Sequence, residues 1–143
     1  MICLVNSKYD GFLVKLNSLI ITPYHPIFYE NRWQFPIDIY KNNLNKSLPN
    51  PFFSLIETHK SEWVCNLVLD KNHLANIEEF KCVTLGHGFH EEVVRHDYYG
   101  TESIISDLKK LKGWTSGLVT LNDFEVKRDE SNLVTGIIFN EVF

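Results

Sequence analysis

The chain lacks the features that place many proteins on nucleic acid or in a membrane. Its 143 residues carry 14 basic and 18 acidic side chains, for a formal net charge of −4, and the basic residues do not cluster in any one segment. Binding to nucleic acid or to an anionic membrane surface usually needs a basic patch, so neither partner is expected. No apolar run approaches the roughly 18 residues of a membrane span. No basic segment followed by an apolar core opens the chain, so we expect no signal peptide and a cytoplasmic location.

Cysteine is also scarce. Cys3, Cys65 and Cys82 make an odd count without close spacing, which argues against a disulfide framework. Each lies in an apolar run, where a free cysteine packs as a small hydrophobe, and a reducing compartment is the simplest setting. The glycine-rich phosphate loops and the G-x-S-x-G motif are absent, and we predict no cofactor.

Hydrophobic residues make up 44% of the chain, which is enough for a core, so disorder is not expected. Short apolar runs broken by turn residues predict a mainly β fold. Asp10-Gly11 predicts a hairpin between the first two runs, and residues 42–51 are expected to form a surface loop. The expected strands cover residues 2–5, 12–16, 19–22, 27–29, 33–35, 52–57, 63–69 and 80–85.

One helix is expected, over residues 102–112. Thr101 is a suitable N-cap, and Gly113 is a natural stop. Strands over 118–126 and 133–139 should follow it as a second hairpin. Short strands are expected before Gly88, whereas a strand, a helix and a hairpin are expected after it. We therefore expect a β domain over 1–88 and a strand-helix-hairpin extension over 89–143 packed on it. The expected apolar face of the helix consists of Ile104, Ile105, Leu108 and Leu111.

The most informative stretch is Thr22-Pro23-Tyr24-His25-Pro26. A hydroxyl and an imidazole three residues apart, after an apolar run, can be aimed at one carbonyl. The imidazole can supply the proton that an amide nitrogen needs before it leaves, and the hydroxyl can hold the peptide and share the developing charge. The alternative is a buried His25 bonded to backbone, with the prolines only shaping a turn.

Two later segments present further imidazoles. A strand ends at Asp70, and His73 follows just past a tight turn; the alternative is an exposed histidine in that turn. His87 lies between Gly86 and Gly88, which allow close backbone approach and positive φ. The alternative is a glycine-rich turn that ends a strand.

A metal site is a weaker possibility. Cys82, His87 and His90 could form a zinc site, but no recognised spacing supports it. His90 and His96 are six residues apart, whereas two zinc-binding histidines on one helix are four apart.

Taken together and in this order, the segments resemble a Hint domain, the fold shared by inteins and hedgehog autoprocessing domains. Residues 19–27 followed by 33–36 resemble the T-x-x-H block, 64–73 a strand ending in D-x-x-H, and 82–88 the closing segment with its penultimate histidine. The wording T-P-Y-H-P-I and V-T-L-G-H-G-F, followed by Tyr99-Gly100-Thr101 and Gly113-Trp114, is closest to the Vint subgroup. The resemblance covers most of residues 2–119.

The resemblance implies self-cleavage through an N–S acyl shift, assisted by Thr22 and His25. It assigns His73 and His87 to support of the cleft and later proton transfers, and makes Asp70 a candidate to orient them. Vint domains occur beside von Willebrand type A and U-box modules, so such modules of a larger protein, or a complementary N-terminal Hint segment, are the implied partners.

Two departures qualify this expectation. The family's nucleophile is a cysteine at the first position of the domain, well ahead of the T-x-x-H block, whereas only 21 residues precede Thr22 here. Cys3 lies inside an apolar strand and is a poor substitute. We therefore expect an N-terminally truncated domain, inactive alone. Gly88 stands where inteins have the cyclising asparagine, which excludes splicing. The alternative is a non-catalytic β-rich interaction module derived from a Hint domain.

Overall fold

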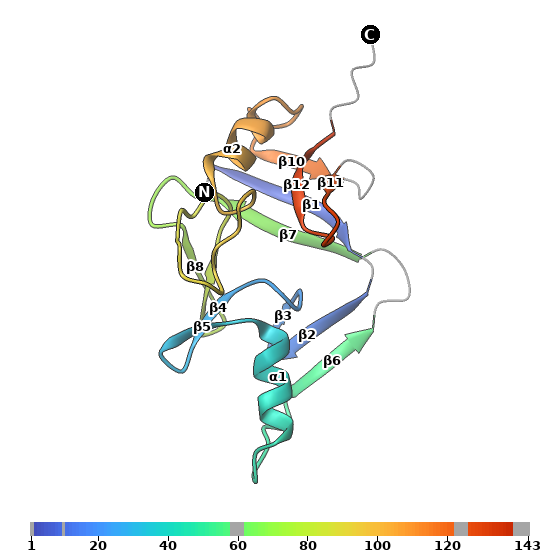
Figure 1. Cartoon of the computed structure of the whole chain (residues 1–143), viewed down its shortest axis with the longest axis vertical. Helices are drawn as coiled ribbons and strands as arrows, with labels where there is room; N and C mark the ends of the chain where they lie inside the picture. The colour runs from blue at the N-terminus through green and yellow to red at the C-terminus, as the bar shows by residue number, and fades with distance from the viewer. Residues whose placement is uncertain (1, 10, 58–61, 122–125, 139–143) are drawn as a thin grey trace.

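The computed structural model describes residues 2–9, 11–57, 62–121 and 126–138. It is mainly β, and Figure 1 shows two regions, one above the other. The upper region contains β1 (Cys3–Tyr9), β7 (Glu62–Val68) and β10 (Leu118–Leu121), with helix α2 (Glu102–Lys109). The lower region contains β2 (Phe12–Leu16), β3 (Leu19–Ile21) and β6 (Phe53–Glu57), with helix α1 (Pro36–Leu44).

The first sheet has the strand order β10-β1-β7. β1 pairs parallel with β10 and antiparallel with β7, so the two strands beside it in the sheet come from distant parts of the sequence. Side chains alternate across the sheet, and one face packs under α2 and the hairpin of β11 (Val126–Arg128) and β12 (Val134–Ile137). This first core consists of Cys3, Val5, Val68, Leu85, Tyr98, Ile104, Leu108, Val119, Leu121, Val134 and Ile137.

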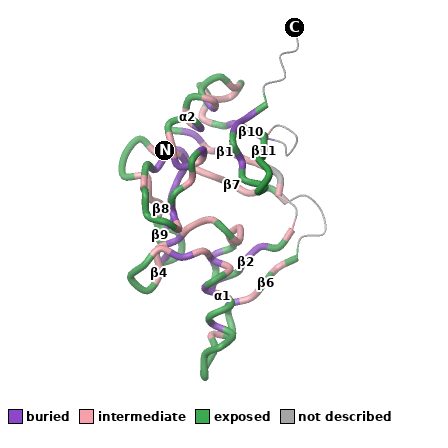
Figure 2. Tube along the Cα trace, viewed as in Figure 1, coloured by how far each residue is buried: buried purple, intermediate pink, exposed green. Residues whose placement is uncertain are grey.

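The second core lies in the lower region. It is enclosed by the sheet β3-β2-β6, by α1, and by a sheet of order β5-β4-β9-β8. The strands of that last sheet are β4 (Ile27–Tyr29), β5 (Arg32–Gln34), β8 (Leu74–Ile77) and β9 (Phe80–Val83). Figure 2 shows buried residues in both regions, along β1 and β10 and along β2. The second core consists of Val14, Leu16, Leu19, Ile27, Ile39, Phe53, Phe80 and Cys82.

One of the segments that pass from one core to the other follows β9. Phe80 and Cys82 belong to the second core, and Leu85 belongs to the first. Between them, Val83 and Thr84 are buried without being members of either core. We call residues 83–84 the crossing segment. The sequence-predicted strand over 80–85 thus corresponds to β9 and its continuation into the upper region.

The hairpin predicted at Asp10-Gly11 is wrong. β1 pairs with β7 and β10, whereas β2 pairs with β3 and β6 in a different sheet. Asp10 itself lies outside the described residues. A turn signal reports a local change of direction, and it does not determine which strands then pair.

The sequence analysis also missed α1. Pro36 occupies the first turn, where its missing N–H costs nothing, and Asp38 and Lys41 suit the two ends of the helix dipole. Ile39 is buried in the second core. The predicted loop over 42–51 therefore begins only after the last helical residue, Leu44.

Helix α2 is confirmed. The Thr101 hydroxyl oxygen accepts a hydrogen bond from the Ser103 N–H at 3.3 Å, and Ile104 and Leu108 are buried in the first core. The helix ends at Lys109 rather than Lys112. Gly113 (φ +101°) is needed there, because a Cβ at this position would lie 2.0 Å from the Leu118 carbonyl oxygen. Among the described residues, neither helix is long and apolar enough to cross a membrane.

Candidate active site

A reverse turn places Thr22 and His25 together. The His25 N–H donates to the Thr22 carbonyl oxygen at 3.4 Å, which closes the turn between β3 and β4. The Ile37 N–H donates to the Pro23 carbonyl at 3.1 Å, so the start of α1 anchors the same turn. Both site candidates are partly buried. The two prolines thus shape the turn, as the alternative interpretation held, and the turn also presents the His25 ring to the crossing segment.

The His25 ring is fixed in one tautomer. Its Nε2 lies 2.8 Å from the Val83 carbonyl oxygen, and because a carbonyl only accepts, Nε2 must carry the hydrogen. Nδ1 makes no hydrogen bond to another described residue. Burial lowers the pKa of His25, and the hydrogen bond to Val83 opposes this only in part. At neutral pH the ring is therefore neutral, and within the described part of the chain its Nδ1 has no hydrogen-bond partner.

His73 faces the crossing segment from the other side. Asn72 (φ 65°) and His73 (φ 48°) are both left-handed, which forms the tight turn ahead of β8. The Thr84 N–H donates to the His73 carbonyl oxygen at 3.0 Å, in register with the pairing of β8 and β9. The ring Nδ1 is buried and has no hydrogen-bond partner among the described residues. Asp70 is exposed and, in the same part of the chain, makes no hydrogen bond to His73, so the orienting role rests on the resemblance alone.

His87 is held by backbone groups. Only 9% of it is exposed, its Nδ1 accepts a hydrogen bond from the Phe89 N–H at 2.9 Å, and the Phe89 ring stacks on it at 5.3 Å. Gly88 and Gly100 are joined by a backbone hydrogen bond of 2.8 Å, which brings the loop against Gly100. A Cβ on Gly100 would lie 2.9 Å from Cε1 of the His87 ring, so the ring needs this glycine.

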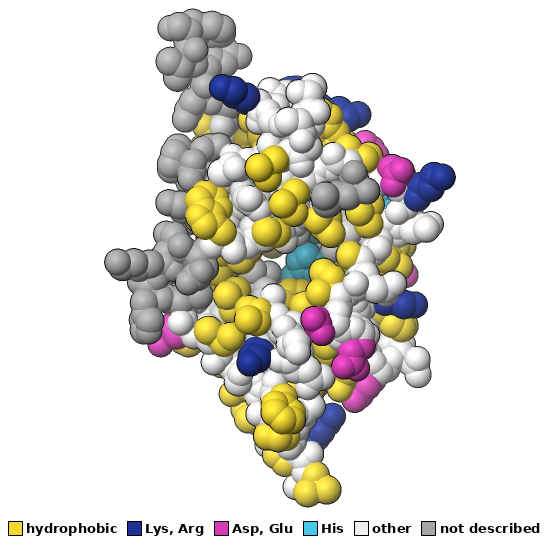
Figure 3. All heavy atoms as spheres, turned by 180° about the vertical axis from the view of Figure 1, so that it is seen from behind, with side chains coloured by type: hydrophobic (Ala, Val, Ile, Leu, Met, Phe, Trp, Pro, Cys, Tyr) yellow, Lys and Arg dark blue, Asp and Glu magenta, His cyan; other side chains and the backbone are white. Residues whose placement is uncertain are grey.

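The structure places the three predicted histidines along one segment of the chain: the His25 ring bonds to Val83, the His73 carbonyl accepts from the Thr84 N–H, and His87 follows three residues later. Burial lowers the pKa of His87, and the positive charges of His73, His25 and His96 lower it further, while a backbone hydrogen bond to Val94 opposes the shift. Figure 3 shows a histidine side chain at the bottom of a hollow bordered by hydrophobic side chains. We call the group of His25, His73 and His87 the histidine pocket.

A protein-family model matches this chain over residues 2–136, and its description is Vint, a Hint domain. The match runs from the N-terminal strand into β12 and spans far more than half of the chain. The chain belongs to the Vint family of Hint domains. No curated protein matches it. The family resemblance predicted from the sequence is confirmed, as is the mainly β fold.

Two further polar residues lie beside the predicted histidines and were not among the site residues predicted from the sequence. Thr84 is 4% exposed in the crossing segment, and its Oγ1 has no hydrogen-bond partner among the described residues. His96 accepts hydrogen bonds at Nδ1 from the N–H groups of Tyr98 (3.1 Å) and Tyr99 (2.9 Å), and so shapes the turn that leads to Gly100. No spacing rule signals either residue, since both depend on tertiary burial.

None of the three cysteines of the Vint domain accompanies the histidine pocket. Cys3 is buried in the first core, and Cys82 is buried in the second, where burial raises the pKa of its thiol to about 11. Cys65 is exposed on β7, and its thiol donates to Asn6 Oδ1 at 3.0 Å. The zinc alternative is wrong for the part of the chain described, where no three His, Cys, Asp or Glu side chains could hold a metal ion together.

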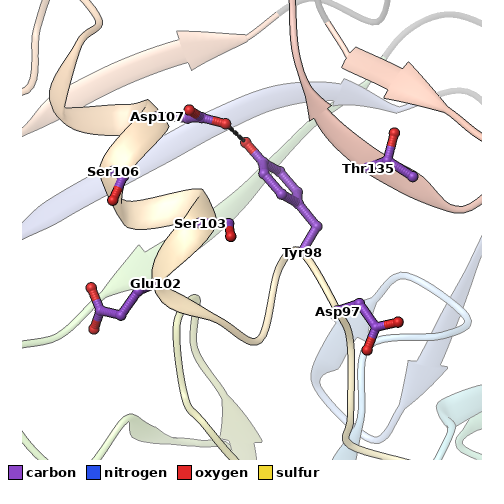
Figure 4. A pocket seen from close by; sticks show the side chains of 7 residues that line it. All are labelled: Asp97, Tyr98, Glu102, Ser103, Ser106, Asp107 and Thr135. Carbon is purple, nitrogen blue, oxygen red and sulfur yellow. Dashed lines mark hydrogen bonds between the residues drawn. The ribbon is translucent and has the colours of Figure 1, made fainter.

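A separate open hollow of about 490 Å³ lies beside α2 (Figure 4). It is lined by hydroxyls and carboxylates, and the Tyr98 hydroxyl donates to Asp107 Oδ2 at 2.7 Å across it. Burial raises the pKa of Tyr98, and the carboxylate of Asp107 adds to the shift. The bond ties α2 to the turn that carries His96, so this hollow supports the Vint site structurally. Its lining consists of Asp97, Tyr98, Glu102, Ser103, Ser106, Asp107 and Thr135.

Proposed function

We propose that this Vint domain promotes self-cleavage of a peptide bond by an N–S acyl shift at the histidine pocket. In that reaction a thiol sulfur attacks the carbonyl carbon of the preceding peptide group. The C–S bond forms, the C–N bond breaks, and the thiol proton ends on the amine nitrogen that leaves. The observation that carries the proposal is the state of His25: Nε2 is bonded to Val83, Nδ1 has no hydrogen-bond partner among the residues that the structure describes, and burial lowers the pKa of the ring.

This state suits a proton carrier. A neutral Nδ1 can accept the proton of the thiol, and because burial lowers the pKa of His25, the resulting imidazolium gives the proton up readily to the leaving nitrogen. The turn that closes from Thr22 to His25 keeps the two residues together, and in the proposal the Thr22 hydroxyl holds the peptide. His73 and His87 complete the pocket; His87 is bonded to backbone and acts by shaping it rather than by carrying the proton.

The attacking thiol must then come from another segment. Cys3 and Cys82 are sequestered in the two cores, and Cys65 is bonded to Asn6 on the first sheet. The proposal therefore requires a Cys-led Hint segment that docks with these residues, and it predicts that residues 1–143 alone do not cleave. Gly88 has no side chain to cyclise, so cleavage rather than splicing is the expected reaction.

The test supplies the missing parts. A reporter and a Cys-led Hint segment are fused upstream of residues 1–143, and release of the reporter is followed after addition of a small thiol. We expect release from the parent fusion, and a 10²- to 10⁴-fold slower release from His25→Ala, the usual cost of losing a general acid–base group. The matched control is His90→Ala, because His90 is exposed and outside the pocket.

The outcomes separate clearly. Release that His25→Ala slows and His90→Ala does not would support the proposal. No release from the parent fusion, although circular dichroism shows it folded, would contradict it. Equal release from His25→Ala and the parent would contradict the role of His25.

One observation favours the second candidate, a non-catalytic interaction module. On the face of the first sheet opposite the first core, Leu118, Leu4 and Leu67 form a cross-strand row, and Leu118 is 47% exposed. Neither core cluster includes these leucines. An open apolar sheet face invites association with another chain. This candidate predicts oligomers of residues 1–143 in light scattering that Leu118→Lys disperses; a stable monomer would oppose it.

A further inference from the structure

Two polar atoms of the crossing region are buried without a partner. Among the described residues, Thr84 Oγ1 and His73 Nδ1 are the buried side-chain nitrogen and oxygen atoms that make no hydrogen bond. A buried polar group left unpaired costs about 1–3 kcal/mol. Two such groups in one place therefore call for an explanation, and a polar partner that binds there is a common one.

The two atoms belong to residues that lie opposite each other. The pairing of Leu74 with Val83, continued by one residue, sets His73 against Thr84, and the hydrogen bond from the Thr84 N–H to the His73 carbonyl confirms that register. Val83, the other residue of the crossing segment, is bonded to the His25 ring. Thr84 is thus bonded to the main chain of His73 and adjoins the residue that binds the His25 ring.

We propose that Thr84 is a substrate-binding residue of this pocket. Its hydroxyl donates a hydrogen bond to the carbonyl oxygen of the peptide group that is cleaved, and His73 Nδ1 bonds the same bound segment. The ligand is a backbone peptide, because its groups offer both an acceptor for the hydroxyl and a donor for the imidazole. The inference rests on the proposed function, and it adds a residue that the family resemblance does not assign.

The stability of a variant without the hydroxyl can distinguish a hydroxyl that binds substrate from one that is hydrogen-bonded within the fold. Replacing an unpaired buried hydroxyl by a methyl group removes the desolvation cost and is neutral or stabilising, whereas replacing a hydroxyl bonded within the fold is destabilising. Thr84→Val has the same shape as threonine, and Thr84→Ser keeps the hydroxyl. The stability and the activity of these variants should therefore move in opposite directions if Thr84 binds substrate.

The first arm uses the reporter fusion described above. We expect Thr84→Val to unfold at the same or a higher urea concentration than the parent and to release the reporter at least about tenfold more slowly, since one donor to a reacting carbonyl is typically worth that or more. Thr84→Ser should stay near the parent rate. A Thr84→Val variant that is less stable, or one that cleaves at the parent rate, would overturn the inference.

The second arm does not need cleavage. The fusion is made with its attacking cysteine changed to alanine, so that the peptide bond is present and intact, and the ¹⁵N shift of His73 Nδ1 is compared with that in residues 1–143 alone. We expect a shift change that Thr84→Val reduces. If the parent fusion does not cleave but this shift appears, the proposed function fails and the peptide-binding role stands. If the parent cleaves and the Nδ1 shift is unchanged, the inference fails by itself.

Discussion

The three rings of the histidine pocket differ in what holds them. Among the described residues, His25 bonds to Val83 through Nε2 and has no partner at Nδ1, and the buried Nδ1 of His73 has none either. His87 accepts a hydrogen bond from the Phe89 N–H, and its ring stacks on Phe89. A proton carrier needs a free nitrogen, whereas a positioning residue needs a fixed ring. The contacts of each histidine therefore indicate whether it is a proton carrier or a positioning residue, which the sequence motif does not.

The His87 ring depends on the absence of a side chain at Gly100. In Gly100→Ala the new Cβ would lie 2.8 Å from the His96 carbonyl oxygen and 2.9 Å from His87 Cε1, so the ring or the turn must move. We expect a loss of about 1–3 kcal/mol in the free energy of unfolding, as for other overpacked sites, measured by urea denaturation. Gly136→Ala is the matched control, because its nearest neighbour would be Lys127 Cδ at 3.6 Å. Equal stability of both variants would contradict the packing described.

Among the elements, α2 could be predicted and α1 could not. The sequence around α2 combines an N-cap, an apolar face and a stop glycine, and all three signals agree. α1 has no side-chain cap at Phe35, and its second half is Tyr40 to Leu44, with two asparagines that favour turns. β1 was predicted as a strand, but its partners β7 and β10 are distant in sequence, so local turn signals gave the wrong pairing.

Some residues of the candidate site could likewise be predicted from the sequence, and others could not. His25, His73 and His87 could be found because each follows a strand end and stands in an ordered set of motifs. Thr84 could not, since its burial and its unpaired hydroxyl arise only when the two cores close on the crossing segment. Asp70 belonged to the motif, yet the structure leaves it exposed.

The N-cap of α2 links the helix to the turn before it. The Thr101 hydroxyl accepts from the Ser103 N–H at 3.3 Å and lies 3.0 Å from the Tyr98 carbonyl oxygen, to which it donates. We expect Thr101→Ala to lower the free energy of unfolding by about 1 kcal/mol, the typical value of an N-cap, and Thr101→Ser to retain most of it. Thermal and urea unfolding would measure both. An alanine variant as stable as the parent would show that this cap contributes nothing.

The whole molecule is two cores joined at the place where the imidazoles lie. The His25 ring bonds to the Val83 carbonyl and the His73 main-chain carbonyl accepts from the Thr84 N–H, so both residues are fixed against the crossing segment. Protonation of the histidine rings should therefore change both the free energy of unfolding and the rate of the proposed reaction.

Stability should rise with pH through the range in which histidine titrates. Burial lowers the pKa values of His25, His87 and His96 below the ordinary 6.5. As the pH falls below 6.5, these histidines bind protons in the unfolded chain before they do so in the folded protein. The free energy of unfolding therefore falls by about 1.4 kcal/mol per pH unit for each such proton. Urea unfolding at pH 7.5 and 5.5 would measure the difference.

A variant can attribute this pH dependence to one ring. His96→Asn keeps an acceptor near the N–H groups of Tyr98 and Tyr99 and removes one titrating group, so it should weaken the pH dependence. His90→Asn should leave it unchanged, because His90 is exposed. Stability that is constant, or that increases as the pH falls from 7.5 to 5.5, would contradict the burial of these rings.

The central claim is that the imidazoles of His25, His73 and His87 share one pocket. NMR titration of the ring signals of residues 1–143 tests it directly, because the charge of His73 lowers the pKa of His87. The account predicts that the pKa of His87 rises in His73→Gln and stays unchanged in His90→Gln. A pKa of His87 that is the same in His73→Gln as in the parent chain would show that the two rings do not face each other, and the pocket would not exist.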